Sequence, residues 1–345
     1  MKKEDISTSS RKILGSRPRG FSVDSQTILL LGVFVVLMIF FSLSSDRFLT
    51  VRSVTSMSFQ LPEIGVLSLA MMITILTGGI NLSVNATSNL AAVISGFFMV
   101  KLIPAGATPE QIILYITLAL ILALLIGTLC GILNGILVGY IGVPPILATL
   151  ATFTLFTGFS TGLTGGKTVT GFPDQFAAIG TTTVAGVPLP FVIFILLVLL
   201  LWLLLQRTTF GFKARMMGSN PVAATFSGID NPSVIMKIYI LSGVLSAITG
   251  IFTMSRTMSA AYEYGTTTFV LLTILISVLA YILPGFGSVF NIFVAVLILQ
   301  VLSTGFNMLL RGVSGGSFFK DFSWGVLMIL IFIANYFIRR RRIRE

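Results

Sequence analysis

The chain of 345 residues contains no histidine and only one cysteine, Cys130. The absence of histidine excludes His-based proton relays, Ser-His-Asp triads and zinc or haem sites with histidine ligands. A single cysteine cannot form an internal disulfide, and Cys130 lies in an apolar run, where a packing role is expected. We find no paired carboxylates and no metal-ligand cluster, so the sequence predicts neither an enzyme nor a bound cofactor.

Charged residues are also scarce. They make up 10% of the chain, against about a quarter in soluble domains. The apolar fraction is 55% and the mean hydropathy is +1.02. This composition excludes an ordinary soluble domain and predicts an all-α polytopic membrane protein, because backbone polar groups inside a bilayer must be satisfied within helices. The net charge of +11 requires no nucleic acid, since basic tails of membrane proteins face anionic lipids.

A helix needs roughly 20 apolar residues to cross a bilayer. The sequence contains ten such runs, which predict about ten transmembrane helices: 27–45, 59–77, 86–103, 111–141, 145–163, 188–206, 234–255, 266–283, 287–310 and 322–338.

The run 111–141 is too long for one straight span. Gly127, Gly131, Gly135 and Gly139 recur in it every four residues, along one helical face. Small residues at this spacing allow another helix to approach closely. One helix, or a helix followed by an interfacial extension, would both fit the sequence.

The basic residues predict the orientation, because short cytoplasmic loops hold an excess of lysine and arginine. With the N-terminus inside, fifteen of the 22 basic residues fall on segments that face the cytosol. The predicted organisation is a cytosolic N-terminal tail at 1–26, a transmembrane domain at 27–338 and a basic cytosolic tail at 339–345. Both termini are therefore expected in the cytosol.

Residues 161–168, "TGLTGGKT", are close to a phosphate-binding loop. That loop requires Gly, four residues and then Gly-Lys-Ser/Thr, but Thr161 stands where the first glycine should be. No strand precedes the segment, and the span count places it on the outer face, where there is no ATP. We therefore predict a Gly-rich outer turn.

A polar stretch, "LTGGINLSVNATSNLAAV", lies between two apolar runs and carries no charge. Gly78 and Gly79 permit a tight reversal, and Asn81, Ser83 and Asn85 are among the side chains that can bond freed backbone groups. Non-helical backbone at membrane depth is tolerated where it is buried or lines a cavity. An ordinary polar loop between helices is the alternative.

Few charges lie near or within the apolar runs. Glu63 follows Pro62 early in the second run, and an intramembrane carboxylate is a functional candidate. A position near the outer headgroups would instead make Glu63 harmless. Arg256 and Glu263 flank the connection after the seventh run and are expected at the outer surface.

The longest basic connection, 207–233, contains signals for a short helix. Asn220 is a good N-cap, Pro221 suits the first helical position and Gly228 suits the end. Such a helix is a docking element for a soluble partner, or a connector with no partner.

These segments resemble the permease subunits of bacterial ribose-type sugar ABC importers. "TGGINLSVNA" is similar to the family's Gly-Gly-Ile-Asp-Leu-Ser-Val-Gly, and "LCGILNGILVGYIGVPPILATLATFTLFTGFSTGLTGGK" and "TTFGFKARMMGSNPVAATFSGID" match further family elements in the same order. The ordered set covers roughly residues 60 to 255.

The resemblance implies an inner-membrane, multi-pass permease with the ABC importer permease fold. Its expected partners are a periplasmic sugar-binding protein, a separate ABC ATPase and a second permease subunit. It assigns the translocation path or gate to Gly78, Gly79, Asn81, Ser83 and Asn85, with Glu63 as a further candidate. It assigns ATPase coupling to Gly218, Asn220, Pro221, Ala223, Ala224 and Gly228.

The chain departs from the family at several positions. Asn81 replaces the family aspartate, Asn85 replaces a glycine, and the turn after 266–283 keeps only Gly285 and Gly287. These departures predict pairing with a different permease, while a homodimer stays open. The solute also stays open among a pentose, a hexose, a polyol and a furanose-like signalling molecule. An ion-coupled secondary transporter is the alternative function, based on Glu63.

Overall fold

The computed structural model describes residues 25–104 and 106–310, and beyond them residues 319, 322–326, 329–330 and 333. Except for two residues in the first helix, the predicted tails at 1–26 and 339–345 lie outside the described residues. So does most of the tenth apolar run, 322–338.

Most of the described chain is helical, as predicted. The helices are α1 (Ser25–Ser44), α2 (Val51–Leu76), α3 (Val84–Leu102), α4 (Pro109–Gly135) with a π-helical extension (Ile136–Tyr140), α5 (Pro145–Thr164), α6 (Asp174–Thr181), α7 (Leu189–Arg207), α8 (Thr209–Ser219), α9 (Pro221–Phe226), α10 (Asn231–Thr257), α11 (Thr266–Leu279) and α12 (Val289–Leu309). The strands have two residues each: β1 (Val169–Thr170), β2 (Thr183–Val184), β3 (Val187–Pro188) and β4 (Ser259–Ala260).

Each of the first nine predicted runs contains a helix. Seven described helices are long and apolar enough to cross a membrane: α1, α2, α4 with its extension, α5, α7, α10 and α12. The other two helices, α3 and α11, are less apolar or shorter than a membrane-crossing helix requires. The stretch before and within α3 is polar, and α11 has only 14 residues. The largest boundary error is at α2, which begins at Val51, well before the predicted run 59–77.

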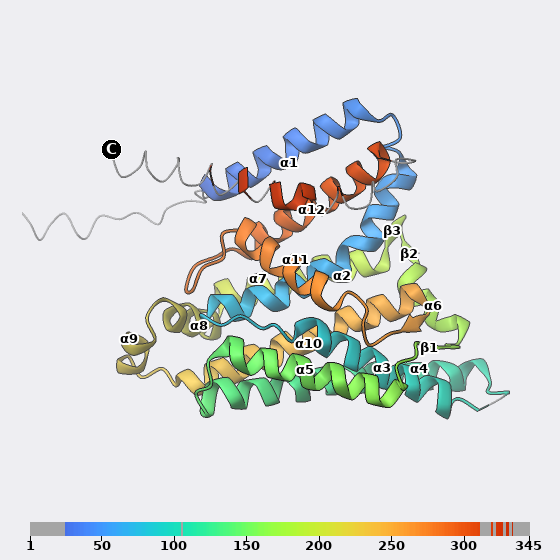
Figure 1. Cartoon of the computed structure of the whole chain (residues 1–345), viewed down its shortest axis with the longest axis horizontal. Helices are drawn as coiled ribbons and strands as arrows, with labels where there is room; N and C mark the ends of the chain where they lie inside the picture. The colour runs from blue at the N-terminus through green and yellow to red at the C-terminus, as the bar shows by residue number, and fades with distance from the viewer. Residues whose placement is uncertain are drawn as a thin grey trace, which may run out of the picture.

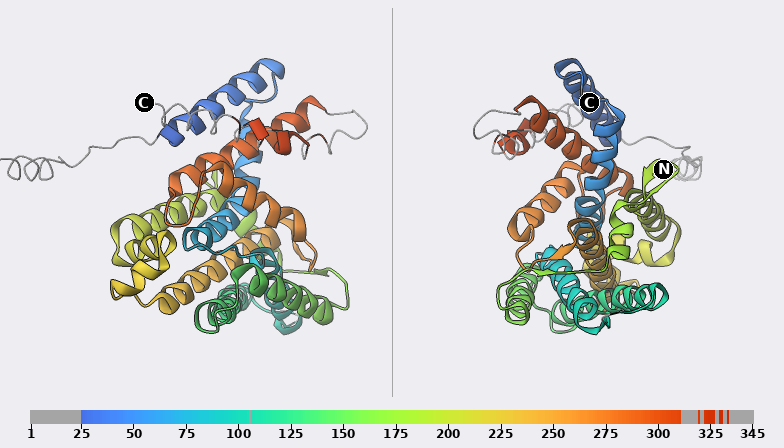
Figure 2. Two further views of the ribbon diagram at one scale, coloured as in Figure 1. Left: turned by 60° about the vertical axis from the view of Figure 1, so that its left-hand side comes forward. Right: turned by 90° about the vertical axis from the view of Figure 1, so that its right-hand side faces the viewer.

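The centre of the fold is α2, which passes between two groups of helices (Figure 1). It contacts α10 on one side and α12 on the other. The pair α1 and α12 lies apart from the group formed by α3, α4, α5 and α10, as the turned views confirm (Figure 2). Most of α2 is buried, whereas α4, α5 and α7 expose leucine and isoleucine side chains. Exposed apolar faces of this kind fit a lipid environment.

The glycine stripe is a close helix-packing face, as the sequence predicted, and the helix that packs against it is α10. A side chain at Gly127 would collide with the Gly243 carbonyl, and one at Gly131 with the Tyr239 carbonyl. Gly139 faces the Pro232 carbonyl at 3.0 Å from an added Cβ. The stripe therefore allows backbone-to-backbone packing, and α4 runs directly into its π-helical extension as one element.

Three features at the two ends of the molecule were not predicted. Helix α8 occupies the first part of the connection 207–233, and α6 with the β2–β3 hairpin follows α5 at the opposite end. Strand β1 pairs with β4, with Val169 opposite Ala260, which ties the segment after α5 to the segment after α10. The "TGLTGGKT" segment is the end of α5 and the turn after it, so it is not a phosphate loop.

Candidate functional site

The polar stretch between α2 and α3 forms a non-helical segment, residues 77–83, which we call the central segment. Gly79, Asn81 and Ser83 are buried in it. Gly78 has φ of +87°, a left-handed conformation that favours glycine. A side chain at Gly79 would approach the Tyr239 hydroxyl at 2.8 Å. The two glycines therefore allow the chain to leave α2 sharply and to lie against α10.

A continuous chain of hydrogen bonds holds the central segment. Thr152 donates to the Asn134 side-chain oxygen (2.7 Å), and Asn134 donates to the Ser83 hydroxyl (2.8 Å). Ser83 donates to the Asn81 side-chain oxygen (2.8 Å), and Asn81 donates to Ser242 (3.0 Å). The members are all buried and come from α5, α4, the central segment and α10.

The hydrogen-bond chain ends on α2, because the Ser242 hydroxyl donates to the Ala70 carbonyl (3.0 Å). The N–H of Leu82 also donates to Thr149 on α5 (3.1 Å). Ala70 lies well inside α2, so the central segment returns from the end of α2 toward its middle before α3 begins. Every polar group named here has a partner, as buried non-helical backbone requires.

The start of α3 binds the connection between α10 and α11. Asn85 donates to the Tyr264 carbonyl (2.9 Å), and Asn89 donates to the carbonyls of Tyr262 and Tyr264 (3.0 Å each). Asn85 is therefore a buried side chain that anchors this connection.

The end of α2 is packed against α8 and the turn before α12. The N–H of Gly285 donates to the Leu76 carbonyl (2.8 Å). A side chain at Gly218 on α8 would collide with the same carbonyl. This contact joins α8 directly to the helix end that precedes the central segment. The left-handed φ of +79° at Gly285, and the Ser219 backbone that a side chain there would meet, favour glycine at this position.

The predicted short helix is present as α9. The Asn220 side chain accepts the N–H of Ala223 (3.0 Å), Pro221 is the first helical residue and Gly228 has φ of +76°. Ala224 is fully buried, whereas the Phe226 side chain is 89% exposed. The Phe226 ring therefore lies at the surface of a short, capped helix at one end of the molecule.

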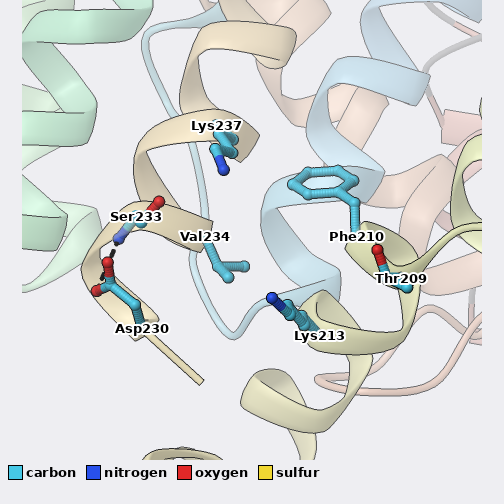
Figure 3. Close-up of a pocket in the computed structure, with 7 residues that line it drawn as sticks. All are labelled: Thr209, Phe210, Lys213, Asp230, Ser233, Val234 and Lys237. Carbon is cyan, nitrogen blue, oxygen red and sulfur yellow. Dashed lines mark hydrogen bonds between the residues drawn. The ribbon is translucent and has the colours of Figure 1, made fainter. Parts of the chain in front are cut away.

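A cavity of about 140 Å³ lies beside this region, between α8 and α10 (Figure 3). Lys213 and Lys237 point toward it from the two helices. The Asp230 carboxylate accepts the N–H of Ser233 (3.3 Å) and so caps the start of α10. The charge at this end of the molecule is therefore mainly positive.

Glu63 forms the one ion pair found among the described residues. Arg256 donates to both carboxylate oxygens of Glu63, from Nε and Nη2, at 2.9 Å each. Glu63 is only 4% exposed, so its carboxylate is buried within the protein. The Arg256 side chain, expected at the surface, is 32% exposed, and its guanidinium turns inward to pair with this buried charge.

The ion pair borders a cavity of about 210 Å³ between α2, α11 and α12. Nη2 of Arg256 also donates to the Tyr264 hydroxyl (3.1 Å). Burial raises the pKa of Tyr264, so this phenol keeps its proton at neutral pH. Further lining residues are Gln60, Phe269, Gln300, Ser303 and Trp324. The cavity lies in the half of the molecule away from α8 and α9.

The structure thus divides the predicted path residues into two groups. Gly78, Gly79, Asn81 and Ser83 lie together in the central segment, and Asn85 begins α3, whereas Glu63 lies at the separate α2–α11–α12 cavity. Tyr264 connects the two groups, through its carbonyl to Asn85 and its hydroxyl to Arg256. Asn134, Thr152 and Ser242 were not predicted as site residues. The signal for Thr152 and Ser242 was a polar residue within an apolar run, and Asn134 also lies in a segment that matches the family.

Apolar helices that enclose a polar, non-helical segment are the architecture of a multi-pass membrane protein. A protein-family model described as branched-chain amino acid transport system, permease component, matches residues 53–334. The chain belongs to this family of transport-system permeases, and is the permease subunit of an ABC importer, a transport subunit of the bacterial inner membrane.

Curated relatives agree with this assignment. The autoinducer 2 import system permease protein LsrD of Yersinia pestis (strain Pestoides F) is 32% identical over 288 residues, which cover 81% of this chain and 83% of the relative. LsrD of Yersinia pseudotuberculosis serotype O:1b (strain IP 31758) has the same identity and coverage. No solved structure matches the chain. The relatives are named for autoinducer 2, so the ribose-type subclass suggested by the sequence is not supported. An ABC importer permease works with an ATPase and a binding protein.

Proposed function

We propose that this permease moves a small, neutral, hydroxyl-rich solute that a periplasmic binding protein delivers and a separate ATPase drives inward. The observation that carries the proposal is the connection from α9 through α8 to the end of α2. Gly218 of α8 lies against the Leu76 carbonyl, directly before the central segment. A displacement of α9 by the ATPase therefore reaches the polar centre of the protein by rigid-body motion.

The buried polar groups support a neutral solute. The central segment contains amides and hydroxyls and no charge, and such groups bind sugar hydroxyls weakly enough to release them. Among the solutes that the sequence left open, the relatives' name favours the signalling molecule. We propose autoinducer 2 or a related sugar-like compound as the solute class.

The orientation has both termini in the cytosol and about ten transmembrane helices. Lys213 and Lys237 then lie on the cytosolic side, as the positive-inside tendency favours. Lys167, in the turn after α5, faces outward. Anionic lipids are the expected partners of the basic cytosolic surfaces.

The central segment is proposed as part of the cytosolic gate, held closed in this conformation by its hydrogen-bond chain. Gly78 and Gly79 are the hinge, because they join the end of α2 to a segment tied to three other helices. Opening requires these hydrogen bonds to be exchanged for bonds to water or solute.

The partner subunit is proposed to contact α5. One face of α5 exposes small side chains, including Thr154, Gly158 and Gly162, at the spacing that allows close helix packing. Asn81 stands where the family has an aspartate, so we propose a heterodimer with a permease that retains the acidic residue. A homodimer is the alternative.

An ion-coupled transporter is less well supported by the structure. Such a mechanism needs a carboxylate that can bind a proton or cation. Both oxygens of Glu63 accept hydrogen bonds from Arg256. The carboxylate is therefore neutralised within the protein.

Ala223→Trp tests the docking role of α9. Ala223 is exposed, so the indole projects toward the partner without entering the core. We expect normal membrane insertion but loss of ATPase co-purification or of coupling between ATP hydrolysis and uptake. Ala178→Trp is the matched control, because Ala178 is also exposed on a short helix, α6, at the opposite end. Normal ATPase binding and normal uptake in Ala223→Trp would refute the docking role.

A further inference from the structure

We propose that the cavity between α2, α11 and α12 is a solute site that receives a neutral polyol, such as a sugar, at the outer end of the translocation path. This inference rests on the proposed function and adds the place and chemistry of recognition. It starts from the cavity itself, which has a volume of about 210 Å³ and is bordered by charged, amide, hydroxyl and aromatic side chains.

The polar groups around the cavity offer both donors and acceptors. Gln300 is 91% buried, since its exposed fraction is 9%, and it lies on the largely apolar helix α12. Its amide nitrogen makes only long hydrogen bonds, 3.4 Å to Gln60 and 3.3 Å to Thr304. An amide held so weakly at a cavity wall has hydrogen-bonding capacity left for a ligand.

The charges of the site cancel. Arg256 and Glu63 form a bidentate pair, and the Arg256 side chain remains 32% exposed. An anionic solute would compete with Glu63 for the guanidinium, and a cationic solute would compete with Arg256 for the carboxylate. A neutral polyol avoids both conflicts, because each hydroxyl can donate and accept hydrogen bonds.

Aromatic side chains complete the site. Phe269 and Trp324 line the cavity, and the Tyr264 ring packs edge-on against Phe269 at 5.6 Å between centroids. Small-molecule sites combine apolar and aromatic walls with a few placed polar groups. The cavity therefore matches the two surfaces of a sugar, its hydroxyl edge and its apolar face.

The location fits the entry of a solute. Gln60 lies in the first half of α2, Arg256 in the last turn of α10 and Ser303 late in α12. These positions share the half of the molecule away from α9. Tyr264 then links an occupied cavity to Asn85 at the start of α3, through its carbonyl.

The test uses the two tryptophans of the chain as reporter and control. Trp324 lines the cavity, whereas Trp202 lies on α7 and packs against Arg207. The full-length permease carrying Trp202→Phe, in lipid nanodiscs, is titrated with D-ribose, with xylitol and with the anionic D-ribonate. We expect a saturable change in Trp324 fluorescence with both neutral compounds and none with D-ribonate.

Substitutions then locate the response. Gln300→Leu is expected to weaken the D-ribose response about tenfold, whereas Asn307→Leu, an exposed amide on the same helix, leaves it unchanged. Gln60→Leu, at the exposed edge of the cavity, gives the same test if Gln300→Leu fails to fold. A flat response to both neutral probes, or equal affinity in the glutamine variants, would overturn the site.

The two proposals fail separately. ATP-driven uptake with no change in Trp324 fluorescence would refute the proposed outer site and support the proposed transport function. A saturable change in Trp324 fluorescence without ATP-driven uptake of any solute would confirm the outer site and refute the proposed transport function.

Discussion

Replacing Arg256 with methionine should destabilise the protein strongly, because it leaves Glu63 charged and buried. The carboxylate is 4% exposed and loses two hydrogen bonds of 2.9 Å. Breaking a fully buried pair in this way costs about 3–5 kcal/mol. Because the Arg256 side chain is 32% exposed and borders a cavity, we expect a smaller loss of about 2–3 kcal/mol in the free energy of unfolding.

The single cysteine provides the assay. Cys130 is buried on α4, so a maleimide dye reacts with it only when the protein opens. Unfolding in increasing SDS is followed by this reaction for the wild type, Arg256→Met and the double variant Glu63→Gln/Arg256→Met. The double variant removes both charges and should recover to within about 1 kcal/mol of the wild type. Equal stability of Arg256→Met and the wild type, or no recovery in the double variant, would refute this reasoning.

Three further perturbations test the packing, the hydrogen-bond chain and the orientation. Gly131→Leu should lower the free energy of unfolding by about 3 kcal/mol or more, because the new side chain meets the Tyr239 backbone. Gly158→Leu is the control and should leave the free energy of unfolding unchanged, because a side chain there meets open space. The reactivity of Cys130 during unfolding compares the two variants. Asn134→Leu should lower the free energy of unfolding by about 1–3 kcal/mol, because it leaves Ser83 and Thr152 without their buried partner. An unchanged unfolding midpoint would contradict a stabilising role of the hydrogen-bond chain. In a Cys130→Ala background, an impermeant thiol reagent should reach a cysteine at Lys167 from outside but one at Lys213 only after permeabilisation; labelling of both from one side would reverse the topology.

The sequence predicted the features that depend on local or one-dimensional patterns. Apolar runs located nine helices, because bilayer thickness sets their length. The four-residue glycine period predicted that another helix packs closely on α4, but it did not predict that this helix is α10. Asn220, Pro221 and Gly228 predicted α9, because caps act within a few residues.

The candidate site was harder to predict because its contacts are distant in the chain. Glu63 and Arg256 are 193 positions apart, and Asn81 and Ser242 are 161 apart. A single sequence carries no pairing signal at such distances. Arg256 was therefore expected at the surface, and the polar residues of α4, α5 and α10 that hold the central segment were not recognised. Helix α8 was missed because its pattern is short and only three of its residues are buried.

The central claim is that ATP hydrolysis on a separate subunit drives solute through this permease. The direct measurement is uptake of labelled solute into proteoliposomes that contain the permease, its ATPase and a second permease, with the binding protein outside and ATP inside. We predict uptake of autoinducer 2 or a neutral sugar that requires both ATP and the binding protein and is lost in Ala223→Trp. Uptake that proceeds without ATP and instead follows an imposed proton or sodium gradient would contradict the account.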